Sequence, residues 1–159
     1  MKTAIIVFGL AFALPVAVTA EEAKVEAKAA DVEVVVEGND QMKFSKTEFT
    51  VKEGQTVSVT LKNVGKLPKM AMGHNLVIIQ PGTDALLFAN DCAPNMATTG
   101  LPNQEKFKSA IVAGTKMLGP GEEDTITFTA PEPGKYDFLC TFPGHCAAQM
   151  RGVMTVEAK

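Results

Sequence analysis

Alternation between apolar and polar residues is the feature of this sequence that most restricts its fold. Residues 55–62 alternate strictly, with Val57, Val59 and Leu61 on one face and hydroxyl-bearing residues on the other. A period of two is typical of a β-strand that buries one face. At residues 32–36 the valines at 32, 34 and 36 alternate with the residues between them, and residues 75–79, 124–129, 135–140 and 152–157 are further strand candidates.

Turn-forming residues separate these segments. They cluster at residues 38–40, 53–54, 119–121 and 131–134. Many short strands with such punctuation predict an all-β, antiparallel sandwich. Residues 80–116 break the pattern, because residues 84–89 are typical of a short helix and a stretch containing Pro, Gly and Asn follows. We expect this segment to be an insertion that covers part of the sandwich.

The N-terminal residues have the pattern of an export signal. Lys2, an apolar run and small residues before the cut predict a signal peptide over residues 1–20, cleaved after Ala20. Residues 21–31 are low in complexity and predict a flexible segment, which leaves a single domain over residues 32–159. We therefore expect a periplasmic or otherwise extracytoplasmic protein. The apolar run is too short for stable membrane insertion.

The charge balance limits the kinds of partner. The formal net charge is −3, and it becomes −4 once Lys2 leaves with the signal. A mildly acidic chain has no electrostatic basis for binding nucleic acid. Trp is absent, and no basic patch is interleaved with aromatic residues. Nucleic acid is therefore not expected as a partner.

A set of soft donors follows the strand at residues 135–140. Cys140, His145 and Met150 lie close together in sequence, and His74 is the only other histidine of the chain. Thiolate favours Cu(I), imidazole accepts both copper oxidation states, and a long axial thioether tunes the potential. This donor set predicts a blue-copper electron-transfer site.

The strand period also predicts how the donors come together. Alternation places Tyr136, Phe138 and Cys140 on one face, which we expect to be the inner one. The Cys140 sulfur would then point into the end of the sandwich. A turn through Pro143 and Gly144 would bring the loop histidine beside it, while His74 arrives from another strand.

Each donor taken alone has a simpler interpretation. An exported cysteine is more often in a disulfide, a methionine is more often core filler, and a single histidine is usually an ordinary core or surface residue. The combination at this spacing favours copper. Two other functions remain open: a copper-binding or copper-delivery protein without a redox role, and a copper enzyme such as a nitrite reductase. The enzyme needs a second metal site, for which no histidine remains. A binuclear copper centre would need two bridging cysteines, and the spacing of Cys140 and Cys146 fits that poorly.

Specific motifs extend the argument beyond the donor types. From about Val32 to its end the chain resembles the cupredoxins, the family of blue copper proteins, and among them the azurins most closely. The motifs that carry the resemblance lie at residues 38–42, 67–69, 72–75, 114–122 and 140–145.

The resemblance implies a fold, a metal and a function. The fold is an eight-stranded Greek-key β-sandwich with a short helical insertion. The cofactor is one type 1 copper ion, with His74, Cys140 and His145 as equatorial ligands, Met150 as the axial ligand and the Gly73 carbonyl as a weak fifth contact. Asn75 would tie the two ligand segments together and support the thiolate. The function is single-electron transfer by Cu(I)/Cu(II) cycling between redox protein partners, so the protein would not be an enzyme.

The sequence departs from the azurin pattern in several places. Met150 follows His145 by five residues where azurins usually have four, and this spacing resembles auracyanins and plastocyanins. The cysteines of the azurin N-terminal disulfide are missing. Asn63-Val64-Gly65 stands where some azurins carry a further histidine.

Cys92 and Cys146 are additional cysteines with no counterpart in azurins. Export exposes them to oxidising conditions, and both remain once copper takes Cys140. The family's apolar surface draws on both regions, so an intramolecular disulfide is one expectation. Two free thiols, or an intermolecular bridge through Cys146, are the other.

An apolar docking surface is the last expectation. Met72, Phe142 and Met96 should surround His145, whose ring edge would reach the surface. Such a patch suits docking of redox protein partners. The alternative is that these residues only cap the core.

Overall fold

The computed structural model describes residues 29–159. The predicted signal peptide lies outside the described residues, and the predicted flexible segment is represented only by its last three residues. Among the described residues, no helix is both long enough and apolar enough to cross a membrane.

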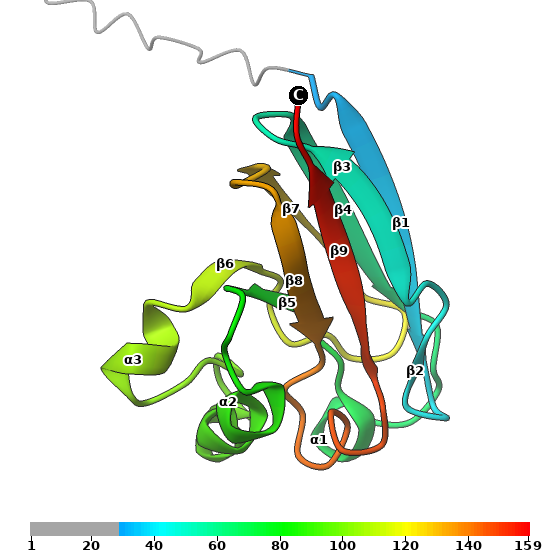
Figure 1. The fold of residues 1–159 in the computed structure, drawn as a ribbon. Coiled ribbons are helices and arrows are strands. Elements are labelled where there is room, and N and C mark those ends of the chain that lie inside the picture. The colour runs from blue at the N-terminus through cyan, green and yellow to red at the C-terminus, as the bar shows by residue number, and fades with distance from the viewer. Residues whose placement is uncertain (1–28) are drawn as a thin grey trace, which may run out of the picture.

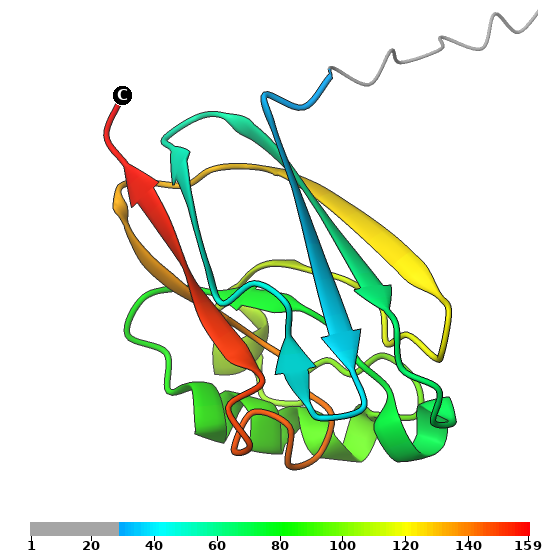
Figure 2. The same ribbon diagram turned by 90° about the vertical axis from the view of Figure 1, so that its right-hand side faces the viewer.

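Two β-sheets stack face to face in the described part of the chain (Figures 1 and 2). The four-stranded sheet has the order β2 (Lys43–Phe44), β1 (Val32–Asn39), β4 (Thr56–Asn63) and β7 (Glu123–Thr129). The five-stranded sheet has the order β3 (Glu48–Lys52), β9 (Arg151–Glu157), β8 (Gly134–Leu139), β5 (Val77–Ile79) and β6 (Ile111–Gly114).

The predicted sandwich is confirmed, with two differences in detail. The described residues contain nine strands because the two-residue β2 pairs with the end of β1 after the turn at residues 39–42. The sheets are also not purely antiparallel, since β1 pairs with β4 and β3 with β9 in parallel. The physical reason is that β3 lies in the sheet opposite β1 and β4. The chain crosses to the other sheet to form β3 and then crosses back, so β4 lies beside β1 and runs in the same direction.

The predicted insertion contains three short helices between β5 and β6. These are α2 (Ala85–Cys92), the 3₁₀ helix η1 (Ala93–Asn95) and α3 (Glu105–Lys108). The Asp84 carboxylate caps α2 by accepting from the backbone N–H groups of Leu86 and Leu87. The helix predicted at residues 84–89 is therefore confirmed and extends further. The insertion ends earlier than expected, because β6 lies within residues 80–116 and pairs with β5.

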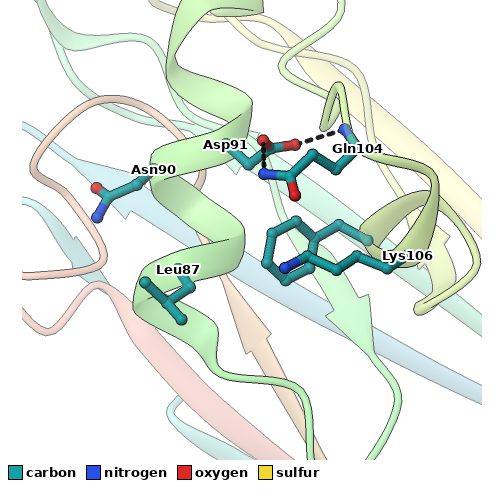
Figure 3. Close-up of a pocket in the computed structure, with 6 residues that line it drawn as sticks. Leu87, Asn90, Asp91, Gln104 and Lys106 are labelled. Carbon is teal, nitrogen blue, oxygen red and sulfur yellow. Dashed lines mark hydrogen bonds between the residues drawn. The ribbon is translucent and has the colours of Figure 1, made fainter.

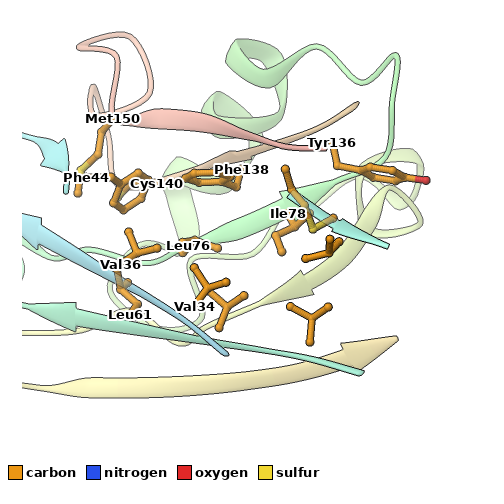
Figure 4. Close-up of a cluster of buried hydrophobic side chains, with 14 of the residues drawn as sticks. Val34, Val36, Phe44, Leu61, Leu76, Ile78, Tyr136, Phe138, Cys140 and Met150 are labelled. Carbon is orange, nitrogen blue, oxygen red and sulfur yellow. The ribbon is translucent and has the colours of Figure 1, made fainter. Parts of the chain in front are cut away.

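The main core fills the space between the sheets (Figure 4). Val57, Val59 and Leu61 are fully buried, as their alternation predicts. Tyr136 and Phe138 face the same core, so the predicted inner face of β8 is also confirmed.

A second apolar cluster covers the outer face of the five-stranded sheet. Val77, Ile79 and Leu139 point to this side and pack against α2 and α3, including Phe88 and Phe107. β5 is therefore buried on both faces and lacks the alternation seen in β4.

One end of the sandwich collects the segments that carry the donors. The short helix α1 (Lys69–Met72), the insertion and the loop that follows β8 all lie at this end (Figure 1). The C-terminus lies at the opposite end of the sandwich.

Candidate metal centre

His74 lies in the short segment between α1 and β5. It forms an isolated bridge with Leu118, with its N–H donating to the Leu118 carbonyl at 3.0 Å and its carbonyl accepting at 2.7 Å. Gly73, between α1 and this bridge, leaves little room for a side chain, because a Cβ there would lie 2.7 Å from the Lys69 carbonyl oxygen. The His74 backbone is thus held from both sides.

Cys140 and His145 come from the two arms of one loop. The Cys140 N–H donates to the Met150 carbonyl at 3.0 Å, which extends the β8–β9 pairing by one step. The His145 N–H donates to the Phe142 carbonyl at 3.0 Å and closes the turn through Pro143 and Gly144. The predicted return of the loop histidine towards the cysteine is present.

The three strongest donors form one buried cluster. Cys140 Sγ lies 3.4 Å from His145 Nδ1 and 4.0 Å from His74 Nδ1. The ligand atoms of these three residues all lie within 4.8 Å of one another. The Gly73 carbonyl oxygen is 4.0 Å from the same sulfur.

Met150 closes the cluster from the other end of the loop. Its side chain is fully buried, and its N–H donates to the His145 carbonyl at 2.9 Å. A Cβ at Gly38 would lie 3.0 Å from Met150 Cε and 3.1 Å from His74 Cδ2. The thioether and the first imidazole therefore meet at the same point of β1, which only glycine can occupy without moving them.

Asn75 links the two donor-bearing segments. Its Oδ1 accepts from the Thr141 N–H and its Nδ2 donates to Thr141 Oγ1, both at 2.8 Å. These bonds join the residue after His74 to the residue after Cys140. The tie expected of Asn75 is present in the geometry.

Burial keeps the donors uncharged when no metal is bound. It raises the pKa of Cys140 to about 12, against the opposing effect of the backbone N–H groups of Asn75 and Phe142. Burial, and then the positive charge of a protonated His74, lower the pKa of His145 to about 4. Burial also lowers the pKa of His74, although the Asn39 carbonyl and the charge of Asp40 oppose this. His74 Nε2 nevertheless has no hydrogen-bond partner of good geometry among the described residues.

This arrangement fits a soft transition metal. One thiol and two imidazole Nδ1 atoms converge in a dry pocket, and a thioether lies beside them. Thiolate and thioether select copper or zinc over hard cations, and imidazole suits both metals. The buried donors have few alternative partners, so bound metal would satisfy them together.

The surface expectation for His145 needs a correction. The residue is only 2% exposed, and the Phe142 ring packs against its ring at a tilt of 36°, with centroids 4.5 Å apart. Met72 and Met96 are half-buried. The ring edge of His145 therefore does not reach the surface, and Phe142 is the apolar side chain packed against it.

Of the two expectations for Cys92 and Cys146, the structure shows free thiols and no disulfide between them. Cys92 and Cys146 are free thiols, both buried in the second apolar cluster. Burial raises the pKa of Cys92 to about 12, and it also raises the pKa of Cys146. Because the thiolate is the reactive form, both thiols are held in an unreactive state. The Cys146 thiol also donates to the Ala85 carbonyl at 3.6 Å.

Sequence reasoning missed several contributors to this site. The sequence pattern predicts a turn at Gly38, and only the closeness of Met150 and His74 to it in the structure reveals its place beside the donors. Thr141 lies within a recognised motif, but its hydroxyl partner comes from the insertion, at Gly100. No local sequence signal brings residues 41 positions apart together.

Comparisons with known proteins agree with this site. The family model described as copper binding proteins, plastocyanin/azurin family, matches residues 30–157. The chain is 36% identical over 133 residues to azurin from Pseudomonas aeruginosa, covering 81% of this chain and 87% of that protein. It is 40% identical over 131 residues to azurin-1 from Alcaligenes xylosoxydans xylosoxydans, covering 79% and 97%.

Solved structures show the same likeness. Reduced auracyanin from Roseiflexus castenholzii superposes with a TM-score of 0.71 at 41% identity, covering 81% of this chain and 99% of that one. Auracyanin A, a blue copper protein from Chloroflexus aurantiacus, gives a TM-score of 0.66 at 32% identity, covering 79% and 98%.

The lowered pKa of His145 predicts a pH-dependent stability of the metal-free protein. The unfolded chain binds a proton near pH 6.5, whereas folded His145 does so only near pH 4. The contribution of His145 to the free energy of unfolding should therefore be complete above pH 6.5. Below pH 6.5 the free energy of unfolding should fall by about 1.4 kcal/mol per pH unit, until about pH 4. Urea unfolding of metal-free protein across pH 4.5–7.5 measures this slope.

His145→Gln removes the titrating group and should reduce that slope by the same amount. The residual slope then reports His74 and the carboxylates. An unchanged slope in His145→Gln would contradict the assignment of the lowered pKa to this residue.

Proposed function

The chain belongs to the plastocyanin/azurin family of copper-binding proteins, and we propose that it is a type 1 copper protein that carries single electrons between redox partners. The observation that carries this proposal is the cluster of Cys140, His74 and His145, whose ligand atoms converge within 4.8 Å in a buried pocket. Bound copper would supply the one-electron change between Cu(I) and Cu(II).

We assign the ligands from this geometry. Cys140 Sγ and the Nδ1 atoms of His74 and His145 are the three strong donors, and Met150 is the weak axial donor. The carbonyl of Gly73, the residue directly after α1, is a still weaker contact. Asn75 supports the cysteine from behind through its backbone N–H and through its bonds to Thr141.

Rigidity of the donor set supports a carrier. His74 precedes β5 and is paired with Leu118, Cys140 directly follows β8, and the loop that carries the other donors is closed by backbone bonds, so the fold holds the donors close together without a metal. A site that changes little between two oxidation states exchanges electrons with little rearrangement. Both histidines of the chain lie in this cluster, and the proposed reaction needs no further substrate site.

Electrons would pass through the covered edge of the site. His145 packs against Phe142, the half-buried Met72 belongs to α1 at the same end of the sandwich, and the half-buried Met96 packs against the core cluster that contains Phe142. This apolar layer would exclude water while a partner approaches. We propose that donor and acceptor proteins dock here, and that the signal peptide over residues 1–20 delivers the protein to an extracytoplasmic compartment.

The visible spectrum tests the ligand assignment. The copper(II)-loaded protein should show an intense band at about 600 nm from cysteine-to-copper charge transfer. Cys140→Ser should abolish the band, while Met150→Ala should retain it and shift the reduction potential. A colourless copper complex of the unmodified protein would instead favour a copper-delivery function, and a blue Cys140→Ser would refute the ligand assignment.

Proton release gives a second, colour-independent test. At pH 7 both histidines are already neutral, and the Cys140 thiol, with a pKa of about 12, is protonated. Uptake of Zn(II) or Co(II) should therefore release about one proton per metal ion. Calorimetry in buffers of different ionisation enthalpy counts these protons. Cys140→Ser should release none, whereas two or three from the unmodified protein would contradict the neutral-histidine site.

Electron self-exchange tests the docking surface. Met72→Lys places a charge in the apolar layer and should slow self-exchange several-fold, because two copies must then bury that charge. The absorption spectrum should stay nearly unchanged. The matched control is Val35→Lys, which adds the same charge outside the proposed docking surface. Val35 is 49% exposed and lies in β1, not in the donor loop. Equal exchange rates for the two variants would refute docking at this surface.

A further inference from the structure

Thr141 connects the metal centre to the insertion. Its hydroxyl lies 2.7 Å from the Gly100 carbonyl and 3.1 Å from Asn75 Oδ1, so its single proton goes to the closer acceptor, Gly100. The same oxygen accepts from Asn75 Nδ2 at 2.8 Å. The insertion thereby holds the residue that links the two donor segments.

Gly100 fits this position because it has no side chain. Its φ is +64°, which disfavours other residues. A Cβ there would lie 2.9 Å from Met117 Cε and 3.0 Å from Asn75 Nδ2. The backbone of Gly100 therefore lies directly against Asn75, and a shift of the loop would move both.

Asn95 holds the loop that presents Gly100. Its carbonyl accepts from the Gly100 N–H at 2.9 Å. Its Nδ2 donates to the Leu101 carbonyl and to Asn103 Oδ1, both at 2.9 Å. Hydrogen bonds therefore close the loop from η1 to residue 103 on itself.

Asp91 fastens this unit to α2. One carboxylate oxygen accepts from the backbone N–H groups of Asn103 and Gln104 at 2.7 and 2.8 Å. The other accepts from Gln104 Nε2 at 2.6 Å, and Figure 3 shows the bonds between Asp91 and Gln104. The Asp91 carbonyl also accepts from Asn103 Nδ2 at 3.1 Å. These bonds, led by the one from the Gln104 backbone, lower the pKa of Asp91 and keep it ionised.

We propose that Asp91 and Gly100 are positioning residues of the metal centre, acting through the Thr141 hydroxyl. Continuous hydrogen bonds run from Asp91 through Asn103, Asn95 and Gly100 to Thr141 and Asn75. Asn75 in turn places its backbone N–H towards the Cys140 sulfur. The inference rests on the proposed copper site, and it assigns the insertion a role in holding the donors as well as covering the sheet.

Metal affinity and reduction potential measure this coupling. Thr141→Val keeps the shape of the side chain but removes the hydroxyl, and it should lower Zn(II) affinity about tenfold, as expected for an outer partner of a metal ligand. It should also shift the reduction potential of the copper form. Thr141→Ser retains the hydroxyl and should restore both properties. Chelator competition gives the affinity, and voltammetry gives the potential.

Asp91→Ala tests the remote end of the path. It should lower Zn(II) affinity and shift the potential in the same direction as Thr141→Val, by a smaller amount. The matched control is Asp31→Ala, because Asp31 also accepts a backbone N–H bond, from Thr56, but precedes β1 and belongs to a different part of the sandwich. Asp31→Ala should leave affinity and potential unchanged.

The double variant decides whether Asp91 acts through Thr141. If it does, Asp91→Ala should have no further effect in the Thr141→Val background, so the two changes are non-additive. Additive effects would overturn the proposal. It would also be overturned if Asp91→Ala and Asp31→Ala had the same Zn(II) affinity and reduction potential. Should Thr141→Val not fold, the comparison of Asp91→Ala with Asp31→Ala still decides whether the insertion influences the metal centre. Failure of the proposed function would show separately, as a colourless unmodified protein.

Discussion

The hydrogen bond from the Cys140 N–H to the Met150 carbonyl is the contact on which the site depends. It continues the β8–β9 pairing and fixes both ends of the donor loop to the sheet. The loop between them closes through the bond from the Met150 N–H to the His145 carbonyl. Cysteine, histidine and methionine donors therefore hold their relative positions through backbone bonds, independently of any metal.

Burying such donors without metal carries a cost that the surrounding structure offsets. The Cys140 thiol and both imidazoles stay neutral in their pocket, since burial shifts each pKa away from the charged form. The Asn75 side chain accepts a hydrogen bond from the Thr141 N–H, and the bridge between His74 and Leu118 pairs the N–H and carbonyl groups of His74. The insertion adds a second layer, because its apolar helices bury the outer face of the five-stranded sheet and its polar loop reaches Thr141.

Much of the fold was predictable, because alternation with a period of two survives wherever one face of a strand is buried. β4 and the inner face of β8 follow it closely. Prediction was weaker where both faces are covered, as in β5, and where the chain crosses between sheets to make the parallel pairs of β1 with β4 and β3 with β9. Both depend on which segments become neighbours, and local periodicity carries no information about that.

The sequence alone determined the donor set and its chemistry, since one loop with Cys140, His145 and Met150 plus a single remaining histidine leaves few alternatives. Only the tertiary structure decided how the donors are held. The contact of Gly38 with Met150 and the bond between Gly100 and Thr141 join residues far apart in the chain. The physical reason is that residue types specify which bonds a site can make, whereas packing of the two sheets and the insertion decides which atoms come within reach.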